Sequence, residues 1–239
     1  MAYAFVQQNP EASTNASGQS SIVSGAFGAS LTAGNLLVCH VWYTGAASPL
    51  TVTLSGGSSP TWNAETVVNN GNEHLHSWYA MNIPGGVTTQ VTATFSGGTA
   101  DFPFIYVAEY SGFATTGARL AFAAQHQASP GTGTDGVTSG LLGTLASQPA
   151  GIIALTFNEN SDGTPTAGTS FTSLTAVGTY AGTVSASARP EHRRVTSTAS
   201  VAGTFTTAVG TSPHKTAAWA FAESGGGGGG GNVTAWLRA

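Results

Sequence analysis

The chain has 239 residues and a formal net charge of −4, and only 7% of its residues are Asp, Glu, Lys or Arg, against about 25% in an ordinary soluble domain. So few charges argue against nucleic acid as a partner, because phosphates need a basic face, and against anionic membrane surfaces. They also argue against most enzymes, since acid–base catalysis and phosphate binding draw on charged side chains.

The hydrophobic fraction of 41% is sufficient for a folded core, so the chain is not predicted to be disordered. Its first residues lack a basic segment followed by a long apolar one, and we expect no secretory signal peptide. No run approaches the ~18 apolar residues of a membrane-spanning helix, so we expect no membrane insertion. Cys39 is the only cysteine; it is predicted to be a small buried hydrophobe, because no cation nearby would make it a reactive thiolate.

Short apolar or alternating runs, separated by Gly, Pro, Asn and Ser, recur along the chain and predict β-strands. No segment has a helical period over about 11 residues. In chain order, the predicted strands lie at 2–6, 21–27, 35–43, 50–55, 62–68, 74–82, 89–95, 104–110, 119–126, 152–157, 171–177, 183–189, 192–198, 201–206 and 215–222.

The apolar pattern of three runs indicates how they are buried. In 89–95, Val91, Ala93 and Phe95 alternate with polar residues, which is typical of a half-buried antiparallel strand. By contrast, 36–43 and 104–110 are apolar on both faces. Such strands either lie centrally or have their outer face covered by another part of the molecule.

Four segments recur in the same order in the two halves, about 1–113 and 118–223. Each half has a Gly-led apolar strand, a mixed strand, an alternating strand that ends in Phe, and an aromatic strand that ends in Ala-Glu. We therefore predict an all-β fold: an antiparallel jelly-roll β-sandwich of two sheets over 1–223, with each half supplying about half of the strands. Two stacked small sandwiches fit less well, because the join at 114–119 is short. The matched segments are Gly34-Asn-Leu-Leu-Val38 with Ala150-Gly-Ile-Ile-Ala154, Trp78-Tyr-Ala-Met-Asn82 with Glu191-His-Arg-Arg-Val195, Val91-Thr-Ala-Thr-Phe95 with Val201-Ala-Gly-Thr-Phe205, and Val107-Ala-Glu-Tyr-Ser-Gly112 with Phe221-Ala-Glu-Ser-Gly225.

The same segments resemble a family of jelly-roll β-sandwich domains that occurs in phage virion proteins and bacterial surface proteins. The resemblance covers about residues 3–223. The domain that it implies is similar in general build to lectin-like and laminin-G-like sandwiches. It implies a fold and a setting, and no reaction, because the matching segments define strands.

The C-terminal residues have a different composition. Residues 224–231 are Ser224 and seven glycines, which predicts a flexible linker because polyglycine has high backbone entropy and no side chain to bury. Residues 232–239 then include Val233, Trp236 and Leu237, an unusual content for a solvated tail. Two interpretations stay open: this end folds back on its own sandwich, or it anchors to a neighbouring subunit as an added strand or apolar contact.

Four groups of polar residues have the composition of a site. His74 and His76 share one face of a strand and could hold a metal, but no third ligand is near, so an ordinary interface face is preferred. The run Asn158-Glu-Asn-Ser-Asp-Gly163 has the oxygen spacing of a calcium loop without its later carboxylate, so a surface turn is preferred.

The third cluster is Glu191-His-Arg-Arg194, the only dense group of charges, which could bind a carboxylate or a sulfated sugar, or form a salt bridge. Glu109 and Glu223 lie at matching ends of the two halves. Such a pair could do acid–base chemistry on a glycosidic bond, or accept backbone hydrogen bonds, or pair with Arg119 or Arg193.

The sequence thus predicts a non-enzymatic structural protein with no catalytic residues, no cofactor and no metal. A neutral surface of small residues suits close packing with copies of itself, a trimer or larger, and with other virion proteins. We expect a phage tail-fibre, tail-tip or head-decoration subunit that is located in the virion and can contact the host surface. The alternatives are a surface filament at the cell surface or outside the cell, a module that binds a host glycan by stacking on Trp62, Trp78 or Tyr79, and, least supported, a polysaccharide-cleaving enzyme.

Overall fold

The structure is a computed structural model that describes residues 2–9, 12–87, 90–128, 133–146, 149–158, 165–175, 177–179, 187–207 and 213–225, with the backbone alone at 133–134 and 177–179. These residues contain no helix. Every paired strand among them is antiparallel, as in the pairs of β4 (Leu36–Thr44) with β8 (Glu73–Ala80) and β10 (Asp101–Ser111). The predicted all-β, antiparallel class is confirmed.

The first half of the chain forms two of the four sheets in the described residues. We call them the inner N-sheet, of seven strands, and the outer N-sheet, of three. The inner N-sheet has the order β1-β10-β4-β8-β6, with β2 also paired to β10 and β7 to β8; the outer N-sheet has the order β3-β9-β5. The remaining bounds are β1 Ala4–Gln8, β2 Ala12–Ser13, β6 Asn63–Ala64 and β7 Val68–Asn70 in the inner N-sheet, and β3 Ser21–Val23, β5 Thr51–Gly56 and β9 Val91–Ser96 in the outer one.

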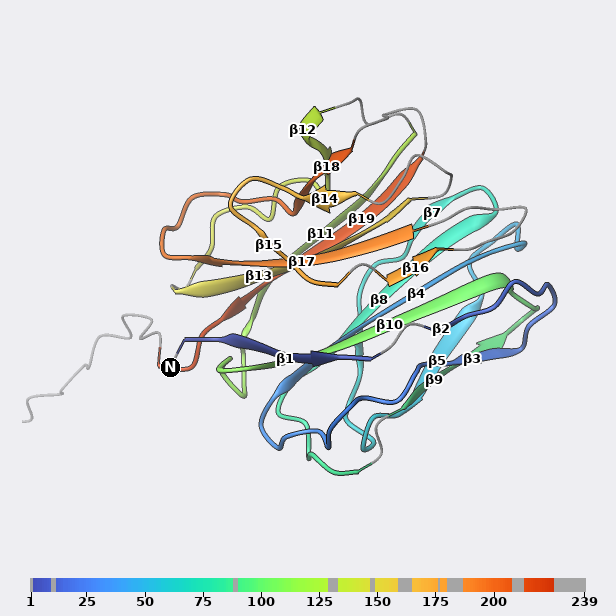
Figure 1. The fold of residues 1–239 in the computed structure, drawn as a ribbon, viewed down its shortest axis with the longest axis horizontal. Helices are drawn as coiled ribbons and strands as arrows, with labels where there is room; N and C mark the ends of the chain where they lie inside the picture. The colour runs from blue at the N-terminus through green and yellow to red at the C-terminus, as the bar shows by residue number, and fades with distance from the viewer. Residues whose placement is uncertain are drawn as a thin grey trace, which may run out of the picture.

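The second half forms the inner C-sheet, of six strands in the order β11-β19-β13-β17-β15 with β16 paired to β17, and the outer C-sheet, in the order β12-β18-β14. The four sheets are stacked as layers, with the two inner sheets face to face in the middle (Figure 1). The bounds are β11 Arg119–Gln127, β13 Ala150–Asn158, β15 Thr172–Ser173, β16 Val177–Thr179, β17 Ser187–Val195 and β19 His214–Ala222 for the inner C-sheet, and β12 Gly133–Thr138, β14 Thr166–Ala167 and β18 Thr204–Thr207 for the outer one.

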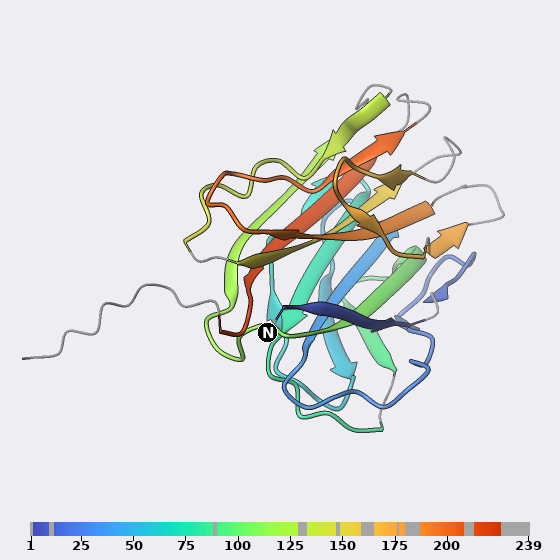
Figure 2. The same ribbon diagram turned by 60° about the vertical axis from the view of Figure 1, so that its left-hand side comes forward.

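The two halves have the same strand order. The inner strands lie side by side as β1-β10-β4-β8 in one half and as β11-β19-β13-β17 in the other. The outer sheets correspond as β3-β9-β5 and β12-β18-β14. The four pairs of segments matched in the sequence lie in or directly beside β4 and β13, β8 and β17, β9 and β18, and β10 and β19. Figure 2 shows the halves as two bodies, blue to green and yellow to red.

The central strands of the inner sheets are buried on both faces, and the sequence of β4 explains how. Because side chains alternate across a strand, Leu36, Val38 and Trp42 pack toward the inner C-sheet, whereas Cys39 and Val41 pack toward the outer N-sheet. The prediction for runs that are apolar on both faces is confirmed for β4 and β10. Val91, Ala93 and Phe95 of β9 are buried as predicted, and Cys39 is fully buried.

The central layer between the inner sheets is the largest core, and it is rich in aromatic rings. Trp42 stacks on Phe157 with ring centroids 4.2 Å apart. Trp219 is fully buried, lies 4.8 Å from the ring of His40 and donates its indole N–H to Glu65 Oε1 at 3.1 Å. The two halves are therefore held together by a continuous apolar layer with polar links at its margin.

The prediction of two sheets is wrong: each half folds into its own pair of sheets, and no sheet in the described part of the chain mixes strands of the two halves. The short join does not prevent stacking, because it runs beside the end of β19: the Ala114 N–H donates to the Ala222 carbonyl, and the Ala222 N–H donates to the Ala118 carbonyl. The connection only has to cross from one inner sheet to the next, which are about 10 Å apart in packed sheets.

Some predicted strands also differ from the observed ones. The break placed at Pro190 is absent, since β17 runs continuously through it, and 62–68 is divided between β6 and β7. The short strand β12 was not predicted, because Gly-Thr-Asp-Gly is typical of a turn.

Candidate functional site

The three rings expected to stack on sugar do not form one platform. Trp78 is only 5% exposed and packs in the outer N-sheet core, so it is a core residue and not a sugar-binding surface. Its neighbour Tyr79 projects to the opposite face of β8, edge-on to Phe221 at 5.6 Å. Trp62 is partly buried against the outer N-sheet core. Trp62 and Tyr79 therefore lie on different faces of the inner N-sheet.

His74 and His76 share one face of β8 as expected, but inside the core. His74 Nε2 lies 2.8 Å from the carbonyl of Ala46, and His76 Nε2 lies 3.0 Å from the hydroxyl of Tyr43. Burial lowers the pKa of both, that of His76 to about 4. The described residues contain no group of three or more His, Cys, Asp or Glu that could hold a metal ion.

Glu109 and Glu223 each have a structural partner. Glu109 is fully buried and accepts hydrogen bonds from Gln7, Asn35 and the backbone N–H of Thr32. Glu223 forms a two-pronged ion pair with Arg194, with Nε to Oε1 at 2.6 Å and Nη2 to Oε2 at 2.9 Å. Glu109 therefore joins β10 to β1 and to the segment before β4, and Glu223 joins the end of β19 to β17.

Two predicted sites fall largely or wholly outside the described residues. They are the calcium-like run, of which only Asn158 is described, and the C-terminal anchor with Val233, Trp236 and Leu237.

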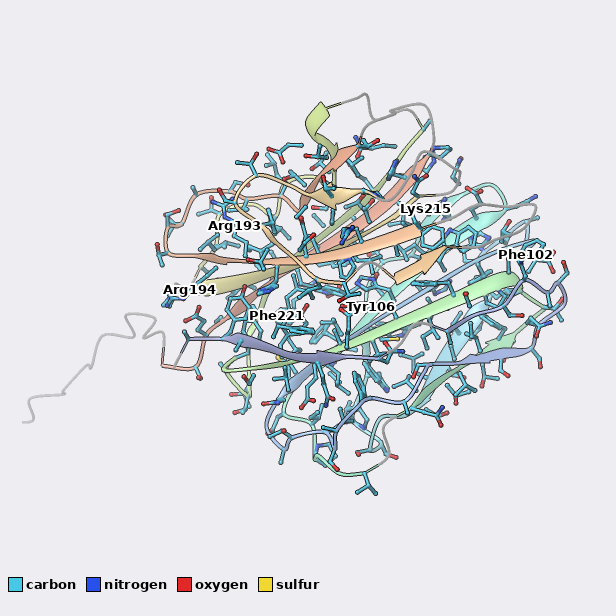
Figure 3. All side chains as sticks on the ribbon, viewed as in Figure 1. Phe102, Tyr106, Arg193, Arg194, Lys215 and Phe221 are labelled. Carbon is cyan, nitrogen blue, oxygen red and sulfur yellow. The ribbon has the colours of Figure 1, made fainter. Side chains whose placement is uncertain are left out.

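The charged run 191–194 borders a polar groove at the end of the second half, which we call the Asp135 groove. Its volume is about 570 Å³, and its walls are mainly hydroxyl-bearing and small side chains together with Asp135, Arg193 and Arg194. Figure 3 shows Arg193 and Arg194 together at the left-hand end of this half, with Lys215 at the opposite end.

The four charged residues of the run separate into different roles. Glu191 is fully buried and Arg194 is paired with Glu223, so neither offers a charge of its own to the groove. Arg193 has its guanidinium carbon 5.7 Å from the centre of the Phe171 ring, a cation–π contact. Among the described residues, Arg193 has no carboxylate within ion-pair distance, so its donors stay available in the groove.

Asp135 and the buried Glu191 are linked through Thr204. Asp135 Oδ1 accepts hydrogen bonds from the Thr204 hydroxyl at 2.9 Å and from the Thr169 N–H at 2.8 Å. Glu191 accepts from the N–H groups of Thr204 at 3.2 Å and Gly168 at 3.0 Å. Because Glu191 is on β17 and its two donors are in or beside the outer C-sheet, this carboxyl holds the groove wall against the inner sheet.

The two carboxyls differ in acidity. Burial raises the pKa of Glu191 to about 8, so it is mainly protonated at neutral pH. The pKa of Asp135 is lowered, since hydrogen bonds from Thr169 and Thr204 and the charge of Arg193 together outweigh its desolvation. Asp135 is therefore the ionised acceptor of the groove.

The raised pKa of Glu191 should make stability fall as pH rises. Between its ordinary value of 4.5 and the folded value of about 8, the folded protein keeps a proton that the unfolded chain releases. The free energy of unfolding should then decrease across this window, by at most about 1.4 kcal/mol per pH unit. Urea unfolding at pH 5 and pH 8 measures this decrease.

The matched variant is Glu191→Gln, which does not titrate. We expect it to be less stable than the natural protein at pH 5, because its amide N–H₂ meets a backbone N–H donor. The difference in the free energy of unfolding between the two proteins should be smaller at pH 8 than at pH 5. Equal pH dependence in the two proteins would contradict the assignment of the shift to Glu191.

A second surface feature is the free edge of the inner C-sheet. Strand β11 has nine residues and pairs only with β19 among the described strands. The other strands at sheet edges have six residues or fewer. After Arg119, β11 contains no charged residue and no proline, the devices that commonly protect an edge from pairing. A hollow of about 640 Å³ beside it is lined by Phe122 and Ala124 of β11 and by Val67 and Val68.

Sequence reasoning missed Asp135, because it stands in a glycine-flanked segment that has the composition of a turn. It also missed that β11 is a long strand with an open edge, because only the position of β11 at the end of a sheet reveals this. The one signal available was the run 191–194, which borders the groove.

Comparison of the chain with family models, with curated proteins and with solved structures finds no match in any of the three. Within the described part of the chain, no helix has the length and apolar character to cross a membrane.

Proposed function

We propose that this protein is a non-enzymatic structural subunit of a virion or other extracellular particle, such as a phage tail-fibre, tail-tip or head-decoration component, that assembles with copies of itself. The observation that supports this most is the nine-residue open edge of β11, which lacks charge along most of its length. Open edges of this kind pair readily with strands of other chains.

We further infer that each half is a jelly roll. In both halves, the chain crosses several times between an inner and an outer sheet. The last strand lies between two earlier ones, β10 between β1 and β4 and β19 between β11 and β13. This arrangement fits two interlocked Greek keys, an architecture frequent in capsid and lectin domains. The fold likeness supports a particle setting by analogy only.

The exterior also suits close packing between copies. On the outer N-sheet, the exposed positions of β5 and β9 are hydroxyl-bearing and uncharged: Thr51, Thr53, Ser55, Thr94 and Ser96. Removing such a surface from water does not incur the large desolvation cost of ions.

The C-terminal anchor, residues 232–239, is proposed to bind as an added strand on β11 of a neighbouring copy. The last described residues leave the fold beside the start of β11, because Phe221 pairs with Arg119. Six glycines at 226–231 can extend about 20 Å. The linker can follow β11 of its own copy from Arg119 to Phe122, a length of about 10 Å. About 10 Å of linker then remains to reach a second copy.

Size-exclusion chromatography with light scattering tests this assembly. We expect the natural chain to form a trimer or larger species, and a chain that ends at Gly225 to keep its circular-dichroism spectrum but lose that assembly. Ala124→Lys should raise the dissociation constant about tenfold or more, since burying an ammonium in an apolar contact costs at least about 1.4 kcal/mol.

The matched control is Ala4→Lys on β1, the corresponding edge strand of the first half, which should assemble normally. A natural chain that stays monomeric at micromolar concentration would reject the proposed function. An assembly that persists in the truncated chain and in Ala124→Lys would reject only the role of β11 and the anchor.

A further inference from the structure

The Asp135 groove combines acceptors and donors that are already held in place. Its volume of about 570 Å³ lies within the roughly 300–1,000 Å³ of small-molecule sites. Its walls are unlike most such sites, because hydroxyls predominate over large apolar side chains. The hydroxyl-bearing residues that line it are Thr169, Ser170, Thr196, Ser197, Ser200 and Thr204.

The donor in the groove is Arg193. Its contact with the Phe171 ring restricts the side chain, so less side-chain entropy is lost when a ligand binds. Arg194, by contrast, is already engaged by Glu223. The groove therefore offers one oriented cation.

The acceptor is Asp135. Thr169 and Thr204 hold its carboxylate, but a carboxylate can accept about four hydrogen bonds, so capacity is left for a ligand hydroxyl. Asp135 and Ser170, both in the groove wall, have positive φ angles of 58° and 68°. Such backbone strain in non-glycine residues is often found at binding sites, where the surrounding structure maintains it.

We propose that the Asp135 groove binds a neutral saccharide. Asp135 would accept from a hydroxyl of the sugar, Arg193 would donate to a ring or hydroxyl oxygen, and the wall hydroxyls would complete the contacts directly or through water. One carboxylate and one guanidinium side by side disfavour a charged ligand of either sign, since each sign meets a like charge. The site is distinct from the rings of Trp62 and Tyr79 and does not depend on assembly.

Saturation-transfer NMR and calorimetry on the full chain, with neutral hexoses and their disaccharides as probes, test the proposal. We expect binding at millimolar concentration or better. Asp135→Asn and Arg193→Ala should each raise the dissociation constant about tenfold or more, as expected when a charge-assisted hydrogen bond is lost. Asn tolerates a positive φ, so Asp135→Asn should fold; thermal melting checks this.

Ser200→Trp provides a second variant that leaves both charged residues intact. Ser200 is exposed and lines the groove, so an indole there should fold normally and block the ligand. The matched control is Ser96→Trp, at an exposed position of the outer N-sheet, which should bind as the natural chain does.

Three results would overturn the proposal. The first is that no neutral sugar binds at about 50 mM. The second is that Ser200→Trp leaves binding unchanged. The third is that binding is lost in Trp62→Ala but kept in the groove variants. Each result is readable in a monomer, so it is separate from the test of assembly.

Discussion

Replacing Trp219 by alanine should lower the free energy of unfolding by about 3–5 kcal/mol. The side chain is fully buried in the layer between the two inner sheets, where it contacts the rings of His40 and Phe122. The substitution removes a large apolar surface and leaves a cavity that close-packed strands cannot fill. It also removes the donor to Glu65, which keeps Arg119 as a partner.

Urea unfolding followed by circular dichroism measures the loss. Trp62→Ala is the control, because that ring is only partly buried, and its loss should be clearly smaller. Since each half has its own second core between its two sheets, weakening the shared layer should also broaden or split the transition. A loss below about 1 kcal/mol with one sharp transition would show that the central layer does not couple the halves.

Replacing Glu73 by alanine should be the second most damaging change, with a loss of about 2–4 kcal/mol. Lys215 of β19 is fully buried, and its Nζ lies 3.0 Å from Glu73 Oε2 of β8, so the ion pair joins the two halves. Removing one partner of a buried pair commonly costs about 3–5 kcal/mol. We expect somewhat less, because the Glu73 side chain is 29% exposed and water reaches it.

Lys215→Met is the informative comparison. It removes the charge together with the need for a partner, and methionine has a similar length and packs well in apolar surroundings. Burial already lowers the pKa of Lys215, which indicates that the charged form is held at a cost. We therefore expect Lys215→Met to change the free energy of unfolding by less than about 1.5 kcal/mol. If Lys215→Met lowered the free energy of unfolding more than Glu73→Ala does, the ion pair would be a net source of stability.

Local patterns in the chain were sufficient to predict the fold class and several details of burial. Short alternating or apolar runs between turn residues predict strands whatever their partners are, which is why the all-β class and the buried face of Val91, Ala93 and Phe95 agree with the structure. The doubly apolar run of β4 predicted that something must cover both of its faces. The sequence match between halves likewise anticipated which strands hold equivalent positions.

Which sheet covers each apolar face was decided only by the tertiary structure. Period-2 patterns identify apolar faces but not which sheet lies against them, so two sheets and four sheets are equally compatible with the same runs. For the same reason, Trp78 could not be recognised as a core residue from its strand alone. The strand β12 and its Asp135 have the local chemistry of a turn, and only pairing with β18 makes a strand of them.

The candidate site shows the same division. Composition determined that charge would be scarce, and the run 191–194 stood out as its only dense cluster. Which of those charges is buried, which is paired and which faces a groove was decided by contacts with Thr204, Glu223 and Phe171, residues up to 29 positions away along the chain. Side-chain environment is set by such long-range packing, because hydrogen bonding and desolvation depend on neighbours in space rather than on neighbours in sequence.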